Sequence, residues 1–111
     1  MPRPAGRSPG YLSGTMKYFH RTSVSPDQVM ERATTFFGAR LTPAAEGPGR
    51  RQFAGSIGLV TVTVEAEGGH YTLIVVETNQ VGESEADKLA KRFLTVVHTM
   101  AEPSHVARGA Y

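Results

Sequence analysis

The stretch that decides the fold is LVTVTVEAEGGHYTLIVVETN, residues 59–79. Its first half alternates apolar and polar residues with the period of two that a β-strand requires, and it is rich in β-branched side chains. Gly68 and Gly69 follow, and glycine adopts the positive φ angles of a two-residue primed turn without strain. The residues after them return as a second strand. The stretch therefore predicts a β-hairpin around which the rest of the chain is arranged.

A two-residue turn at Gly68 and Gly69 fixes which residues lie opposite each other on the two strands. It pairs Val64 with Leu73, and Val60 with Glu77. The residues predicted to face the core are then Val60, Val62, Val64, Ala66, Tyr71, Leu73, Val75 and Glu77. The other face receives Thr61, Thr63, Glu65, Thr72, Ile74 and Val76.

The segment before the hairpin predicts a strand and then a helix. Residues 16–24 form the strand, and the more apolar even-numbered side, which includes His20, is expected to face the core. Ser25 is a suitable N-cap, proline occupies the first helical position, and Gln28 closes a capping box. Apolar residues then recur at spacings of three and four, which predicts a helix over 26–37.

The remaining elements follow from turn residues and helix signals. Residues 40–50 contain two prolines and two glycines, which predicts a surface loop, and 52–57 predicts a short strand. Ser84, with Asp87 three residues later, marks the start of the last helix, and its apolar stripe consists of Leu89, Phe93, Val96, Val97 and Met100. Pro103 ends that helix, because the residue before a proline is driven out of the helical region.

The predicted order is β-α-β-β-β-α. It describes an α+β two-layer sandwich, with a four-stranded, mostly antiparallel sheet and two helices on one face. The opening strand, followed by Ser-Pro-Asp-Gln-Val (25–29) and a helix, resembles the start of helix-grip ligand-binding domains of the polyketide-cyclase kind. The layout is similar to half of a TATA-binding-protein-like fold. This resemblance covers coarse topology and one capping motif, and it carries over no ligand and no functional residue.

A chain of 111 residues predicts one domain, which we place at 16–102. Residues 1–15 are expected to form a disordered, basic tail rich in proline and glycine, and 103–111 a loose C-terminal tail. Met16 is the first residue of the predicted first strand, so it competes with Met1 as the natural start. The chain has no cysteine, no signal-like segment and no long apolar run, which predicts a cytoplasmic protein without a membrane span.

Charge and histidine spacing argue against several function classes. Nine of the twelve Lys and Arg residues and all ten acidic residues lie between positions 16 and 102, so the domain itself is nearly neutral. Nucleic-acid binding needs a basic face on the folded body, and we therefore do not expect it. The four histidines are not spaced as metal ligands on one element, and no nucleophile motif is present, so neither a metal nor a cofactor is predicted.

The leading function hypothesis is a small non-enzymatic association module. In the predicted register, Ile74 and Val76 adjoin the methyl groups of Thr63 and Thr61 on a sheet face that no predicted helix covers. A sheet face left to water is expected to be polar throughout. We therefore predict that this face is an interface, either in a homodimer or with another subunit of a larger assembly.

The second hypothesis is a small-molecule-binding domain of helix-grip character, with the ligand between the sheet and the last helix. Its polar residues are His20, Tyr71 and Glu77, since the predicted register turns Tyr71 and Glu77 towards the core. A third hypothesis adds chemistry to the same place, a cyclase or isomerase in which His20 and Glu77 exchange a proton. In the alternative without a functional role, Glu77 lies at a strand end and is solvated.

Overall fold

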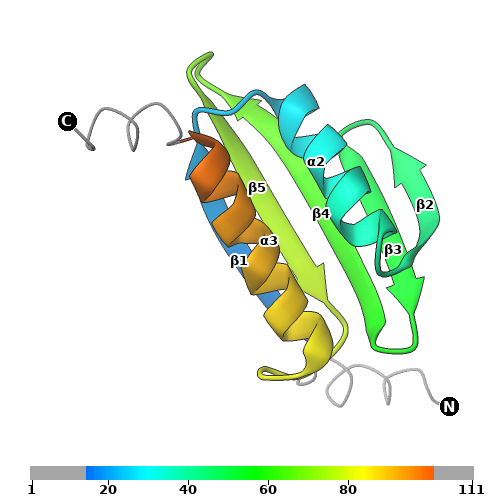
Figure 1. Ribbon diagram of the computed structural model, residues 1–111. Coiled ribbons are helices and arrows are strands. Elements are labelled where there is room, and N and C mark those ends of the chain that lie inside the picture. The colour runs from blue at the N-terminus through cyan, green and yellow to red at the C-terminus, as the bar shows by residue number, and fades with distance from the viewer. Residues whose placement is uncertain (1–14, 102–111) are drawn as a thin grey trace, which may run out of the picture.

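A computed structural model describes residues 15–101, and the two predicted tails lie outside this range except for Thr15. Five strands form one antiparallel sheet in the order β1-β5-β4-β3-β2, and two helices cover one of its faces (Figure 1). The elements are β1 (Met16–Thr22), α2 (Pro26–Gly38), β2 (Thr42–Gly47), β3 (Arg50–Gly55), β4 (Gly58–Glu67), β5 (Tyr71–Thr78) and α3 (Glu85–Ala101). The α+β class with two helices is confirmed. The prediction of four strands is wrong.

The strand missed by the sequence prediction is β2, which occupies the segment predicted as a loop. It is an edge strand that pairs only with β3, and it carries an irregularity between Pro43 and Ala45. Five of its six residues are exposed, so it has no apolar alternation to reveal it. Proline is tolerated at this position because an edge strand needs hydrogen-bond donors on one side only.

The central hairpin is confirmed, but its predicted register is wrong by one residue. Gly68 and Gly69 have φ angles of 63° and 78°, and the His70 N–H donates to the Glu67 carbonyl at 3.4 Å, as a two-residue turn requires. The strand pairing, however, begins with Glu67 opposite Tyr71. His70 is therefore an extra residue between the turn and the strand, in the manner of a β-bulge.

This single residue turns every side chain of β5 to the face opposite the predicted one. Ile74 and Val76 lie completely buried beneath the helices, whereas Val75 and Glu77 lie on the uncovered face. The observed register is favoured because the predicted one would place the Glu77 carboxylate in the core, where a charge without a partner is costly. Opposite Val60 the core instead receives the buried Thr78, whose hydroxyl donates to the Gln80 carbonyl at 3.1 Å.

Deleting His70 tests this account of the register. The deletion leaves a two-residue Gly-Gly turn that joins Glu67 directly to Tyr71, so the observed pairing is preserved. We expect the free energy of unfolding, measured by urea denaturation, to change by less than about 1 kcal/mol. The control is His70→Ala, which keeps the chain length and is expected to be neutral. If the deletion unfolds the protein while the alanine variant does not, the bulge is needed for the fold and our account is wrong.

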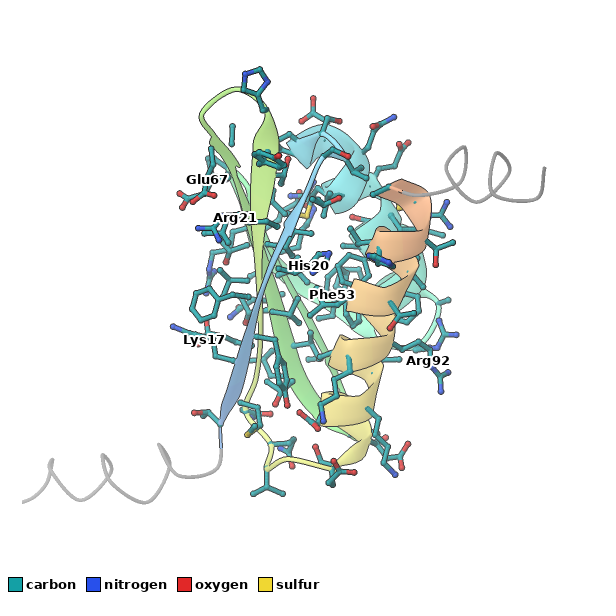
Figure 2. The ribbon with its side chains drawn as sticks, turned by 90° about the vertical axis from the view of Figure 1, so that its left-hand side faces the viewer. Lys17, His20, Arg21, Phe53, Glu67 and Arg92 are labelled. Carbon is teal, nitrogen blue, oxygen red and sulfur yellow. The ribbon has the colours of Figure 1, made fainter. Side chains whose placement is uncertain are left out.

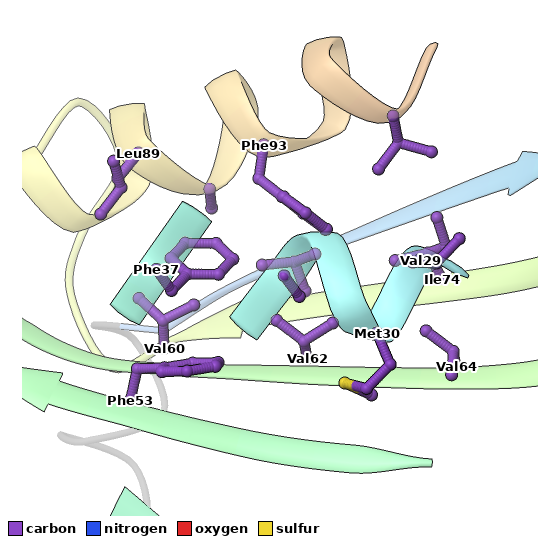
Figure 3. Packing of buried hydrophobic residues seen from close by; sticks show 14 of the residues in the cluster. Val29, Met30, Phe37, Phe53, Val60, Val62, Val64, Ile74, Leu89 and Phe93 are labelled. Carbon is purple, nitrogen blue, oxygen red and sulfur yellow. The ribbon is translucent and has the colours of Figure 1, made fainter. Parts of the chain in front are cut away.

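The core lies between the sheet and the two helices (Figure 3). α2 contributes Val29, Ala33 and Phe37, and α3 contributes Phe93 and Val97, all completely buried. These residues fall on the apolar stripes predicted for the two helices. α2 packs over β4 and β3, and α3 over β5 and β1. As a result no helix of the described range, 15–101, lies on the opposite face of the sheet.

Candidate functional site

The candidate site is the sheet face opposite the helices, called here the open face. Figure 2 shows the sheet edge-on, with His20 and Phe53 directed to the helical side and with Lys17, Arg21 and Glu67 on the other. Strand alternation and the observed pairing define its members. They are Lys17, Phe19 and Arg21 of β1, Tyr71, Leu73, Val75 and Glu77 of β5, Thr61, Thr63, Glu65 and Glu67 of β4, and Arg50, Gln52 and Ala54 of β3.

The centre of the open face is apolar. Phe19 lies opposite Val75, which in turn lies opposite Thr63, so the three form one row across β1, β5 and β4. The Phe19 side chain is 64 % exposed, and Leu73 and Val75 are half-buried. Tyr71, near the hairpin turn, is also exposed. These neighbouring side chains leave a continuous apolar strip in contact with water.

Four of the charged side chains that border this strip form two ion pairs within the chain. Arg21 Nε lies 2.6 Å from Glu67 Oε1, and this hydrogen bond raises the pKa of the Arg21 guanidinium. Lys17 Nζ lies 3.9 Å from Glu77 Oε2, and both side chains are about half exposed. Exposed pairs of this kind contribute little to stability. Because of these pairs, positive and negative side chains lie next to each other around the apolar strip instead of forming a patch of one sign.

The structure separates the three residues predicted to bind a small molecule. His20 faces the helices, where its ring centroid lies 6.4 Å from that of His98, and burial together with the His98 charge lowers the His20 pKa. Tyr71 and Glu77 lie on the open face, at opposite ends of β5. His20 and Glu77 therefore do not form a proton-transferring pair. The space between the sheet and α3 is filled by buried side chains such as Phe93.

The four residues predicted for an interface are also divided between the two faces. Thr61 and Thr63 lie on the open face, and Gln52 Nε2 donates to the Thr61 hydroxyl at 3.1 Å. Ile74 and Val76 are part of the core instead. Leu73 and Val75 take their places on the open face. An uncovered apolar face is therefore present, but β5 supplies it with different residues.

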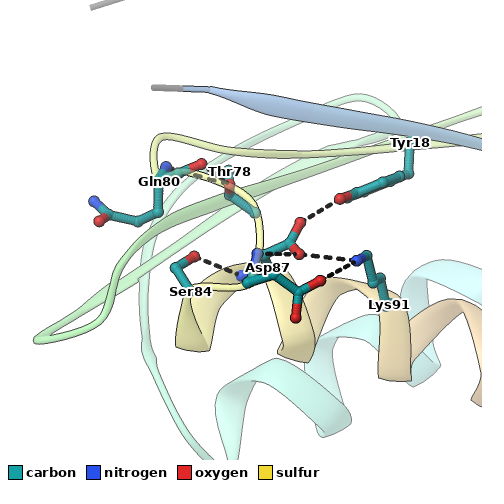
Figure 4. A network of polar contacts seen from close by, with 7 residues as sticks. Tyr18, Thr78, Gln80, Ser84, Asp87 and Lys91 are labelled. Atoms are coloured by element: carbon teal, nitrogen blue, oxygen red, sulfur yellow. Dashed lines mark hydrogen bonds and ion pairs between the residues drawn. The ribbon is translucent and has the colours of Figure 1, made fainter. Parts of the chain in front are cut away.

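A polar network that the sequence interpretation missed joins β1 to the start of α3 (Figure 4). Asp87 is completely buried, and its carboxylate accepts hydrogen bonds from the Tyr18 hydroxyl and, at 2.9 Å, from the Glu83 N–H. Lys91 Nζ lies 3.0 Å from the same carboxylate. The Asp87 N–H donates to Ser84 Oγ at 3.1 Å, which completes the predicted helix cap.

Burial alone would raise the pKa of Asp87, but the hydrogen bonds from Tyr18, Glu83 and Lys91 outweigh it and lower the pKa. The hydrogen bond to Asp87, together with burial, raises the pKa of Tyr18. The carboxylate is thus held in its charged form, and each of its oxygens already has a partner. The capping spacing of Ser84 and Asp87 is the sequence signal that involves this network, and it did not indicate the contact with Tyr18. The role of the network is to attach α3 to the sheet.

The described part of the chain shows neither a metal site nor a membrane span. Residues 15–101 contain no cluster of three or more histidine, aspartate or glutamate side chains able to hold a metal ion. Neither α2 nor α3 is long and apolar enough to cross a membrane.

These features define a small α+β domain with one sheet face covered by helices and one uncovered. Comparison with models of known protein families finds none that matches the chain. Comparison with curated protein sequences also finds no match.

Proposed function

We propose that this protein is a small non-enzymatic association module that forms a homodimer through the open face. The observation that carries the proposal is the apolar strip of Phe19, Leu73 and Val75 on a face that no described element covers. Apolar patches of this kind mark interaction sites, because covering them removes their surface from water. Face-to-face packing of two such sheets is also a common way to complete a β-sandwich.

The size of the face supports a second copy as the partner. Five strands spaced about 4.8 Å apart, six to ten residues long at about 3.3 Å per residue, give a face of roughly 24 by 25 Å. This area, on the order of 600 Å², reaches the lower end of the roughly 600–1,000 Å² that each partner contributes to a standard stable interface.

The charge pattern supports the same partner. The open face carries three cations, Lys17, Arg21 and Arg50, and three anions, Glu65, Glu67 and Glu77. A balanced face meets a copy of itself without net repulsion, as an isologous dimer requires. Nucleic acid or an anionic membrane would instead call for a surface of predominantly positive charge.

Val75→Lys tests the proposal, because Val75 lies at the centre of the open face. The new ammonium would be buried without a partner in the dimer but would be solvated in the monomer. We expect sedimentation velocity to show a dimer for the unaltered protein at tens of micromolar. The variant should dissociate with a Kd raised about 100-fold or more, at an unchanged far-UV spectrum.

The matched control is Thr95→Lys, which adds the same charge on the exposed side of α3. Its side chain in the native protein bonds only to the Lys91 carbonyl one turn earlier, at 3.2 Å. We expect this variant to remain dimeric. If the unaltered protein is a monomer at about 100 μM, or if both lysine variants dissociate alike, the homodimer proposal is wrong.

A further inference from the structure

A second feature lies at one end of the helical side, on the other side of the sheet from the apolar strip. A cavity of about 310 Å³ opens where α2 ends, where β3 turns into β4 and where α3 makes its first turns. Three cations line it, Arg40, Lys88 and Arg92. We call this cavity the basic pocket. Figure 2 shows Arg92 on the helical side of the molecule, away from Lys17 and Arg21.

Arg40 is held in place by the end of α2. Its Nη1 donates to the Phe36 carbonyl at 3.0 Å, and its guanidinium carbon lies 4.5 Å from the centre of the Phe36 ring. A cation is favoured here because the C-terminal end of a helix carries partial negative charge. Since the guanidinium is already positioned by these contacts, little conformational entropy remains to be lost when its other N–H groups bind an anion.

The other two cations are poorly neutralised. Arg92 makes no hydrogen bond or ion pair with another residue of the described range, 15–101. Lys88 Nζ lies 3.8 Å from Glu85 Oε2, and both side chains are more than half exposed, so this ion pair is weak. Glu85 is the one acidic residue among those lining the pocket. Three positive charges, one from the turn after α2 and two from α3, thus share a single cavity with one negative charge.

The rest of the lining is apolar. Leu41 and Leu89 are buried at the base of the pocket, and Ile57 in the β3–β4 turn is half-buried. The combination of an apolar floor with a few converging polar groups is typical of small-molecule sites. The volume of about 310 Å³ lies at the small end of the range for such sites and exceeds what one phosphate group needs.

We propose that the basic pocket binds a small organic anion. A phosphate or carboxylate group would lie among Arg40, Lys88 and Arg92, with its oxygens accepting charge-assisted hydrogen bonds from the two guanidinium groups. The apolar part of the ligand would cover Leu41 and Leu89. This site is independent of the open face, so binding here does not depend on dimer formation.

The test is a titration of the full chain with phenyl phosphate, followed by the backbone amide shifts of an ¹⁵N-labelled sample. We expect saturable shifts at Ser56, Ile57 and Lys88. Inorganic phosphate, which lacks the apolar part, should bind more weakly, and benzyl alcohol, which lacks the charge, should give no saturable shift. Benzoate, compared with phenyl phosphate at equal concentration, distinguishes a carboxylate ligand from a phosphate ligand.

Arg92→Gln removes one cation and should weaken phenyl phosphate binding about tenfold. The matched control is Arg32→Gln, which removes an exposed helical arginine from α2 outside the pocket and should leave the affinity unchanged. The proposal is overturned if no saturation is reached at about 10 mM, if the shifts spread evenly over the surface, or if the two variants bind equally well.

Discussion

Replacing Asp87 with alanine is expected to lower the free energy of unfolding by about 2–4 kcal/mol. The substitution leaves the Tyr18 hydroxyl and the Glu83 N–H, both of them in part-buried hydrogen bonds, without their acceptor. The Lys91 ammonium loses its nearer partner and keeps Glu83 Oε2, which lies 3.5 Å away. The loss should stay below that for a deeply buried ion pair, because the Lys91 side chain remains 48 % exposed and keeps part of its hydration. Urea denaturation of the unaltered and variant proteins measures the difference.

Two further variants separate the network from the general effect of removing an acid at a helix start. Glu85→Ala removes an exposed carboxylate from the same first turn of α3 and should cost less than about 0.5 kcal/mol. Tyr18→Phe, combined with Asp87→Ala in a double-mutant cycle, should show a coupling of about 1 kcal/mol or more. Additive effects of the two substitutions would mean that the Tyr18 contact does not stabilise the fold.

The same network makes the free energy of unfolding decrease as the pH falls into the acid range. The folded-state pKa of Asp87 lies below its unfolded value of 3.8, so the stabilisation is fully present above that value. It is lost as the pH falls through 3.8 towards the folded-state pKa, because protonation removes the charge that Tyr18 and Lys91 bind. Between about pH 5 and about pH 3 the unaltered protein should therefore lose more stability than Asp87→Ala does.

The sequence predicted best those elements whose signals are local. The capping residues Ser25 and Ser84 and the apolar stripes of both helices place α2 and α3 within a residue or two of their observed bounds. The Gly68-Gly69 turn is also where it was predicted. Such signals depend on residues a few positions apart, which makes them readable without knowledge of the fold.

The register was not predictable from the turn alone, because a Gly-Gly turn permits the next residue either to pair or to bulge. The information lay in Glu77. One register buries its carboxylate in the core, and the other places it 3.9 Å from Lys17 in solvent. The predicted register buries Glu77 opposite Val60, whereas the observed register buries Thr78 there. Because a threonine costs less to bury than a carboxylate, the side chains favour the observed pairing, which the loop length alone does not.

The open face is apolar in spite of the one-residue error in the predicted register, and the reason is physical. β5 is apolar on both sides, with Ile74 and Val76 alternating with Leu73 and Val75, so either register leaves two large aliphatic side chains uncovered. An antiparallel strand with one solvated face usually alternates between apolar and polar residues. The departure from alternation identifies β5 as a strand with two apolar faces, but it does not show which residues lie on which face.

The Asp87 network lay beyond sequence reasoning for a different reason. Tyr18 and Asp87 are 69 positions apart, and they meet only because α3 packs across β1. The capping spacing explained Asp87 as a local feature of the helix start. Nothing in that spacing indicated that the carboxylate would also be buried, or that a tyrosine on the first strand would donate to it.

Phe37→Ala is expected to have the largest effect on stability, a loss of about 3–5 kcal/mol. Phe37 is completely buried, and its ring centroid lies 5.3 Å from that of Phe53, 5.1 Å from that of Phe93 and 5.0 Å from that of Phe36. Truncation leaves a cavity between α2, α3 and β3 that rigid aromatic neighbours cannot fill. A loss of this size is a large part of the stability of a small domain, so the midpoint of thermal unfolding should fall by well over 10 °C.

The matched control is Phe19→Ala, the same substitution at a side chain that is 64 % exposed on the open face. At concentrations where the protein is monomeric, this variant should unfold within about 1 kcal/mol of the unaltered protein, because little apolar surface is buried there. At dimer-forming concentrations it should instead dissociate more readily. A Phe19 variant that loses monomer stability as Phe37→Ala does would show that the open face is covered within a single chain, because only covered apolar surface contributes to the free energy of unfolding.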